Sequence, residues 1–160
     1  MKPRLYLETT IISYLTARPS RDMVTSAHQQ ITREWWAQRR RYFDLVTSEL
    51  VIQEAAAGDP DAAQTRLELL RDIPIVQTET QAVSRLASHL LKRCALPRKA
   101  AQDAVHIAVA VTSGVAYLLT WNCKHIANAV MRSKIDEACA ELGYAATVIS
   151  TPLELMEPPE

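Results

Sequence analysis

The stretch AAQDAVHIAVAVTSGVAYLLTWN, residues 100–122, contains a helical pattern, a stop and an apolar strand in direct succession. Residues 100–112 are apolar on nearly every side of a helix, which is typical of a central helix that is buried all round. Gly114 is a natural end for that helix, and residues 117–120 then predict a short buried strand. The fold is therefore expected to include a buried helix that leads straight into a buried strand.

The same alternation of strands and helices continues along the rest of the chain. Further strands are predicted at 4–7, 43–47, 73–76 and 147–149. Further helices are predicted at 11–15, 20–41, 48–57, 60–72, 80–93 and 126–142, with Ser20 as a candidate cap and a last turn at 152–156. The strand at 73–76 contains Pro74, which is better tolerated at the edge of a sheet. This order predicts a three-layer, Rossmann-like α/β fold with about five parallel strands and helices on both faces.

Length and composition favour one soluble domain. The 160 residues predict a single domain over 1–156 and a flexible tail over 157–160. Lys plus Arg and Asp plus Glu are both 18, so a polyanion would have to meet a local basic patch. The three cysteines have no CxxC spacing, which argues against a disulfide framework or a zinc site and favours the cytoplasm. Neither a signal peptide nor an apolar run approaching about 18 residues is visible, so we expect no membrane span.

Acidic and amide side chains follow the predicted strands at one edge of the sheet. Glu8 directly follows the first strand, and Asn122 lies two residues after the strand at 117–120. Asp103 is in the first turns of the buried helix, and Glu54 lies inside the helix after the second strand. Ligands of open α/β sheets bind beyond the carboxyl ends of the strands. Converging carboxylates repel one another, and a hard cation such as Mg²⁺ or Mn²⁺ removes that penalty.

Each of these residues also has a purely structural interpretation. Glu54 fits an ordinary exposed helix position, Asp103 fits a first-turn carboxylate favoured by the helix dipole, and Asn122 fits a turn. Glu8 is harder to explain in this way, because carboxylates are rarely buried without a partner. His106, three residues after Asp103, more often packs or forms a hydrogen bond than binds a metal.

Three segments together resemble a known family, the PIN-domain ribonucleases. These segments are LYLETTIISYL (5–15), VTSELVIQEAAAG (46–58) and AAQDAVHIAVAVTSGVAYLLTWNCKHIANA (100–129). They occur in the order and at the spacing of that family, and within it the chain is most similar to the toxins of VapBC-type toxin–antitoxin pairs. The resemblance implies a Mg²⁺- or Mn²⁺-dependent endoribonuclease with a Rossmann-like parallel sheet.

By position, the resemblance implies that Glu8, Glu54 and Asp103 are the metal-binding acids. Asn122 takes the place of the usual fourth acid, and Thr120 would lie beside the site and orient a ligand or a water. Glu8 stands where the family usually has aspartate. With one acid fewer, the site suits one metal ion better than two.

The resemblance also implies partners. Members of the family are often homodimers, and the toxins are held inactive by a small antitoxin that blocks the site. Arg18, Arg98, Lys99 and Lys124 fall near the predicted rim and are candidates for contacts with an RNA backbone. Lys124 with His125, and the run Arg39–Arg41, fit either solvated positions or such contacts.

Two other functions are considered beside the nuclease. A non-catalytic PIN-like module that binds RNA or a protein is favoured by Asn122. A small-molecule enzyme of the Rossmann type is disfavoured, because the three glycines, Gly58, Gly114 and Gly143, form no glycine-rich phosphate loop.

Overall fold

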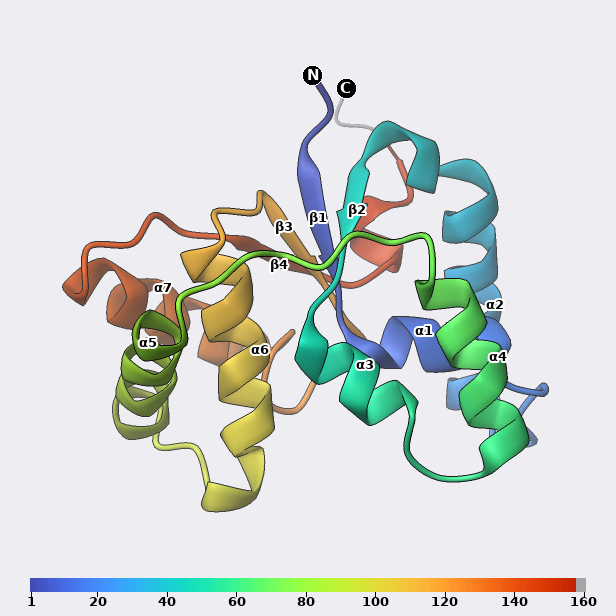
Figure 1. Cartoon of the computed structure of the whole chain (residues 1–160), viewed down its shortest axis with the longest axis horizontal. Helices are drawn as coiled ribbons and strands as arrows, with labels where there is room; N and C mark the ends of the chain where they lie inside the picture. Colours follow the sequence, from blue (N-terminus) through green and yellow to red (C-terminus); the bar gives the residue numbers. More distant parts are fainter. Residues whose placement is uncertain (158–160) are drawn as a thin grey trace.

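The structure is a computed structural model that describes residues 1–157, and a parallel sheet lies at its centre (Figure 1). The strands are β1 (Arg4–Leu7), β2 (Asp44–Val46), β3 (Tyr117–Leu119) and β4 (Val148–Ser150). Their order across the sheet is β2-β1-β3-β4, and every neighbouring pair is parallel. The predicted α/β class with a parallel sheet is thus confirmed.

The sheet has four strands in the described residues, so the prediction of about five is corrected. The segment 73–76 contributes only an isolated parallel bridge between Thr47 and Ile75. The Thr47 amide donates to the Pro74 carbonyl and the Val76 amide to the Thr47 carbonyl, each at 2.9 Å. Extending this ladder by one step would need an N–H from Pro74 to the Leu45 carbonyl, and proline has none. Pro74 therefore stops a fifth strand from forming.

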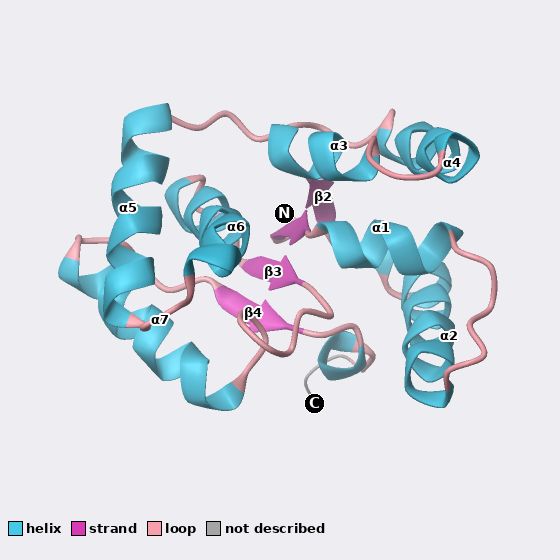
Figure 2. Cartoon of the chain, turned by 90° about the horizontal axis from the view of Figure 1, so that it is seen from below, coloured by secondary structure: helices cyan, strands magenta, loops and turns pink. Residues whose placement is uncertain are grey.

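Helices cover both faces of the sheet. Their bounds are α1 (Thr9–Thr16), α2 (Met23–Gln38), α3 (Glu49–Ala55), α4 (Pro60–Leu70), α5 (Thr80–Arg93), α6 (Ala101–Thr112) and α7 (Ala129–Glu141), with short turns η1 (Arg40–Tyr42), η2 (Arg98–Ala100) and η3 (Leu153–Leu155). Figure 2 shows α5, α6 and α7 on one face, α1 and α2 on the other, and α3 and α4 beyond β2. In the described residues no helix combines the length and the apolarity that a membrane crossing needs.

Side-chain caps determine where several helices begin. The Asp22 carboxylate accepts from the Thr25 amide at 2.9 Å and starts α2, so the cap is two residues later than the predicted Ser20. Ser48 caps α3 as expected, because its hydroxyl accepts from the Val51 amide. Of the predicted tail at 157–160, only Glu157 lies within the described residues, and it is exposed.

The core surrounds α6, which is buried along most of its length as predicted. Leu5 and Leu7 of β1, Ile107 of α6 and Leu90 of α5 are completely buried. Because the parallel strands are covered on both faces, these elements hold the carboxyl ends of β1 and β3 firmly in register.

The end of α5 is a turn that usually requires glycine. The Leu96 amide donates to the Leu91 carbonyl at 3.1 Å, and the Ala95 amide donates to the Lys92 carbonyl at 3.3 Å. This pattern is a Schellman motif, and its central residue Ala95 has a positive φ of 50°. An L-residue with a side chain is strained in that conformation.

Replacing Ala95 with glycine is therefore expected to raise the free energy of unfolding by about 0.5–1 kcal/mol. Glycine relieves the backbone strain of the folded state, and this gain exceeds the stabilisation of the unfolded chain by its added conformational freedom. Urea unfolding measures this change in free energy, and the m-value should stay the same as in the wild type. Ala27→Gly, at an exposed position inside α2, is the control and should lower the free energy of unfolding by about 0.5–1 kcal/mol. Equal losses in both variants would contradict the assignment of strain at Ala95.

Candidate metal centre

Three ionisable side chains meet at the carboxyl edge of the sheet. Glu8, Glu54 and His106 each offer one ligand atom, and these atoms all lie within 4.8 Å of one another. Glu8 follows β1, Glu54 is on α3 and His106 is on α6. Figure 2 looks onto this edge and shows α1, α3 and α6 around it. Two carboxylates and one imidazole at this spacing could hold a metal ion.

Glu8 is buried and held by three donors. Its side chain is the N-cap of α1, with Oε2 accepting from the Thr10 amide at 2.8 Å. The Thr10 hydroxyl donates to Oε1 at 2.8 Å, and the Thr120 hydroxyl donates to the same oxygen at 2.5 Å. Its own backbone N–H donates to the Leu119 carbonyl, which aligns Glu8 with the end of β3. These bonds fix the carboxylate in one orientation without adding a positive charge.

Glu54 is held through only one of its two carboxylate oxygens. The Thr9 hydroxyl donates to Oε1 at 2.5 Å, and Nε2 of His106 lies 2.6 Å from the same oxygen. No donor among the described residues reaches Oε2. Burial opposes ionisation of Glu54, but the hydrogen bond and charge of His106, with the Thr9 hydroxyl, lower its pKa below the ordinary value. Glu54 is thus an ionised carboxylate with one oxygen free for a further partner.

A buried hydrogen-bonded chain continues behind His106. Its Nδ1 lies 2.8 Å from the Tyr6 hydroxyl, and that hydroxyl lies 2.7 Å from Oγ of Ser48. Burial raises the pKa of Tyr6 well above its ordinary value, so its hydroxyl stays protonated. The chain links β1, the start of α3 and α6 to the Glu54 carboxylate.

The structure places the other two predicted ligands outside this group. Oδ2 of Asp103 lies 2.8 Å from Nδ1 of His125, and the Asp103 side chain is about a quarter exposed (24%). Oδ1 of Asn122 accepts from the His125 amide at 3.0 Å, and the Asn122 amide donates to the Thr120 hydroxyl at 2.9 Å. Glu8 and Glu54 are therefore brought together, Thr120 touches Glu8, and Asp103 and Asn122 meet at His125.

The predicted basic residues differ in their surroundings. Arg18, Arg98, Lys99 and Lys124 are exposed. The run Arg39–Arg41 instead lies on aromatic rings: the guanidinium carbons of Arg39 and Arg41 are 4.5 and 5.0 Å from the Tyr42 centroid, and that of Arg40 is 4.8 Å from the Trp36 centroid. Cation–π contacts with these rings thus give the three arginines a structural role. A role in RNA binding stays a prediction for all of them.

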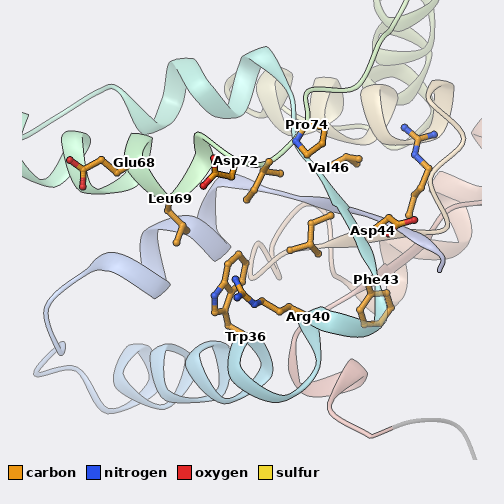
Figure 3. Close-up of a pocket in the computed structure, with 12 residues that line it drawn as sticks. Trp36, Arg40, Phe43, Asp44, Val46, Glu68, Leu69, Asp72 and Pro74 are labelled. Carbon is orange, nitrogen blue, oxygen red and sulfur yellow. The ribbon is translucent and has the colours of Figure 1, made fainter. Parts of the chain in front are cut away.

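A cavity of about 740 Å³ lies away from the metal-binding group (Figure 3). Arg4 and Asp44, at the beginnings of β1 and β2, are among its lining residues, with Trp36, Phe43 and Pro74. The acidic group is at the opposite ends of these strands. The candidate chemistry is therefore at an open edge of the sheet and not in this cavity.

Sequence reasoning placed Thr120 beside the site but missed the supporting roles of Thr9, Thr10 and His106. Thr9 and Thr10 directly follow Glu8, and their hydroxyls were a signal that the two residues could donate to nearby acids. His106 was expected to pack or to form hydrogen bonds, and it does form them. The signal for its place in the site was a polar residue on the face of an otherwise apolar helix, one turn after Asp103.

No family model, no curated protein and no solved structure matches this chain. The resemblance to PIN-domain ribonucleases accordingly stays a prediction. The function has to be argued from the arrangement of Glu8, Glu54 and their neighbours.

Proposed function

We propose that this protein is a metal-dependent endoribonuclease, the toxin of a VapBC-type pair, in which Glu8 and Glu54 hold Mg²⁺ or Mn²⁺. The observation that carries the proposal is the convergence of these two carboxylates, within 4.8 Å, at the carboxyl edge of a parallel sheet. This is where open α/β sheets bind their ligands. The resemblance of the three sequence segments adds the choice of RNA as substrate.

The chemistry of the donor set suits a hard divalent cation. Glu8 has two hydroxyls and one amide as donors, and Glu54 is kept ionised. Within residues 1–157, neither acid is paired with a lysine or arginine. Two such carboxylates this close repel each other unless a cation lies between them. Carboxylate oxygens are the ligands that magnesium and manganese prefer.

The residues of the site then have separate tasks. Glu8 and Glu54 supply carboxylate oxygens, and Thr120 and Thr10 keep Glu8 in its orientation. Asp103 is proposed to complete the ligand set through Oδ1, because only its Oδ2 is engaged by His125. A bound divalent ion would lower the pKa of a coordinated water and stabilise the charge that develops on the phosphodiester.

The remaining predictions belong to the same proposal. Asn122 is proposed to contribute its carbonyl oxygen, which would have to leave the His125 amide. The exposed cations Arg18, Arg98, Lys99 and Lys124 are proposed to contact the RNA backbone. A homodimer and an antitoxin that covers the site are the partners we propose in the cytoplasm.

Calorimetric titration with Mn²⁺ and a cleavage assay on RNA test the proposal together. The wild type is expected to bind one Mn²⁺ per chain and to cleave RNA only when Mg²⁺ or Mn²⁺ is present. Asp103→Asn is expected to abolish cleavage, because the amide removes the charge that the metal needs. The control is Asp61→Asn, an exposed first-turn acid of α4, which should leave both readouts unchanged. Cleavage retained in Asp103→Asn would overturn the assignment of that residue.

A second candidate function is a non-catalytic module that binds RNA or a protein. The observation in its favour is that Asn122 closes a turn through the His125 amide instead of supplying a fourth acid. The variant Asn122→Asp separates the two functions. If neither the wild type nor this variant binds Mn²⁺, the binding module is supported. If Asn122→Asp alone gains Mn²⁺ and cleavage, the natural protein is a weakened nuclease.

A further inference from the structure

Both ring nitrogens of His106 are already engaged. Nε2 lies 2.6 Å from Oε1 of Glu54, and Nδ1 lies 2.8 Å from the Tyr6 hydroxyl. The ring is 2% exposed, and it meets the Tyr6 ring edge-on at a centroid distance of 6.0 Å. The imidazole therefore cannot turn towards an ion without breaking at least one of these contacts.

The positions of the protons follow from the partners. An ionised carboxylate has only lone pairs, so a contact of 2.6 Å to Nε2 requires a proton on that nitrogen. Nδ1 can accept from the Tyr6 hydroxyl in a neutral imidazole, or donate to it in an imidazolium. In both arrangements Nε2 carries a proton that points at Glu54, so Nε2 has no lone pair with which to bind a metal.

We infer that His106 is a positioning residue: it donates Nε2–H to Oε1 of Glu54, fixes that carboxylate for the ion, and does not bind the ion itself. This rests on the proposed metal site. Thr9, on α1, donates to the same oxygen, so Oε2 is the oxygen left for the ion. The ligands supplied by the protein are then oxygens only, which favours Mg²⁺ or Mn²⁺ over zinc.

Tyr6 and Ser48 help to position the imidazole of His106. Tyr6 is completely buried in β1, and Ser48 is the N-cap of α3, the helix that carries Glu54. Through these two hydroxyls the orientation of the imidazole is tied both to the sheet and to the start of that helix. Partners of this kind behind a metal ligand affect metal affinity by about 10–100-fold.

The decisive measurement uses the wild-type protein labelled with ¹⁵N-histidine. Electron spin-echo spectroscopy of bound Mn²⁺ is expected to show no ¹⁵N coupling of the size that a directly coordinated imidazole gives. In the metal-free protein, NMR is expected to show a protected Nε2–H resonance for His106 that persists after Mg²⁺ is added. Loss of that resonance on adding Mg²⁺ would show that the ion replaces the proton, and would overturn the inference.

Two variants assign the signals and test the size of the effect. His106→Leu removes the donor to Glu54 and is expected to weaken Mn²⁺ binding by about 10–100-fold. His106→Gln, whose amide can donate in place of Nε2–H, should recover most of the affinity. His89→Gln is the matched control for a histidine outside the group, because His89 contacts Glu141 and none of the proposed ligands. Thermal unfolding checks that each variant is folded.

The outcomes separate this inference from the proposed function. A direct ¹⁵N coupling that disappears in His106→Gln but persists in His89→Gln would make His106 a ligand, which overturns the inference and leaves the metal site standing. Absence of Mn²⁺ binding in the folded wild type would overturn the metal site, and the inference with it. Bound Mn²⁺ without a direct coupling from His106 supports both.

Discussion

Glutamine in place of Glu54 is expected to weaken Mn²⁺ binding by more than about 100-fold and to remove metal-dependent RNA cleavage, with little change in stability. Loss of a ligand should exceed the 10–100-fold that loss of a supporting partner costs. The amide oxygen of glutamine can still accept from Thr9 and His106, so both partly buried hydrogen bonds survive. The amide nitrogen, however, would occupy the place of Oε2 and present hydrogens to the ion.

Glu49→Gln is the matched control for this variant. Glu49 lies on the same helix, α3, but is exposed and outside the metal-binding group. Calorimetry with Mn²⁺, the cleavage assay and thermal unfolding should therefore give wild-type values for it. Wild-type Mn²⁺ affinity in a folded Glu54→Gln variant would show that the carboxylate of Glu54 holds no ion.

Trp35→Ala is expected to lower the free energy of unfolding by about 3–5 kcal/mol, because truncating a fully buried aromatic side chain leaves a large cavity. Trp35 is 0% exposed on α2 and packs against Phe43, with ring centroids 5.8 Å apart. Urea unfolding measures the loss. Trp36→Ala, at the half-buried neighbouring position, is the control and should cost clearly less.

A second substitution at the same position tests the reason for this effect. Nε1 of Trp35 is buried and has no hydrogen-bond partner among the described residues. Trp35→Phe removes that unsatisfied N–H along with part of the apolar surface, so it should destabilise far less than alanine does. If Trp35→Ala and Trp36→Ala cost the same, the complete burial of Trp35 does not account for the loss.

The class of the fold could be predicted from the sequence, because apolar runs and helical periods alternate so regularly. The number of strands could not be predicted, since it depends on a single hydrogen bond that Pro74 cannot form. The segment 73–76 is apolar enough for a strand, and Pro74 alone did not argue against one, because proline is tolerated at the edge of a sheet. Its missing N–H, however, falls opposite the Leu45 carbonyl, and that register is set by the tertiary structure alone.

The candidate site could also be predicted only in part. The place of Glu8 could be predicted, because an acid directly after a buried strand must lie at the edge of the sheet. The engagement of Asp103 by His125 could not be predicted, because it joins α6 to a loop 22 residues later through side-chain orientations that no spacing specifies. The same holds for His106, whose two partners come from β1 and α3.

The two threonines at the start of α1 have a mechanical consequence. Thr9 holds Glu54 and Thr10 holds Glu8, and successive residues of a helix point about 100° apart. One rigid turn of helix therefore acts as a spacer between the two acids. The separation of the two carboxylates is therefore set by the geometry of one helical turn as well as by the packing of α3.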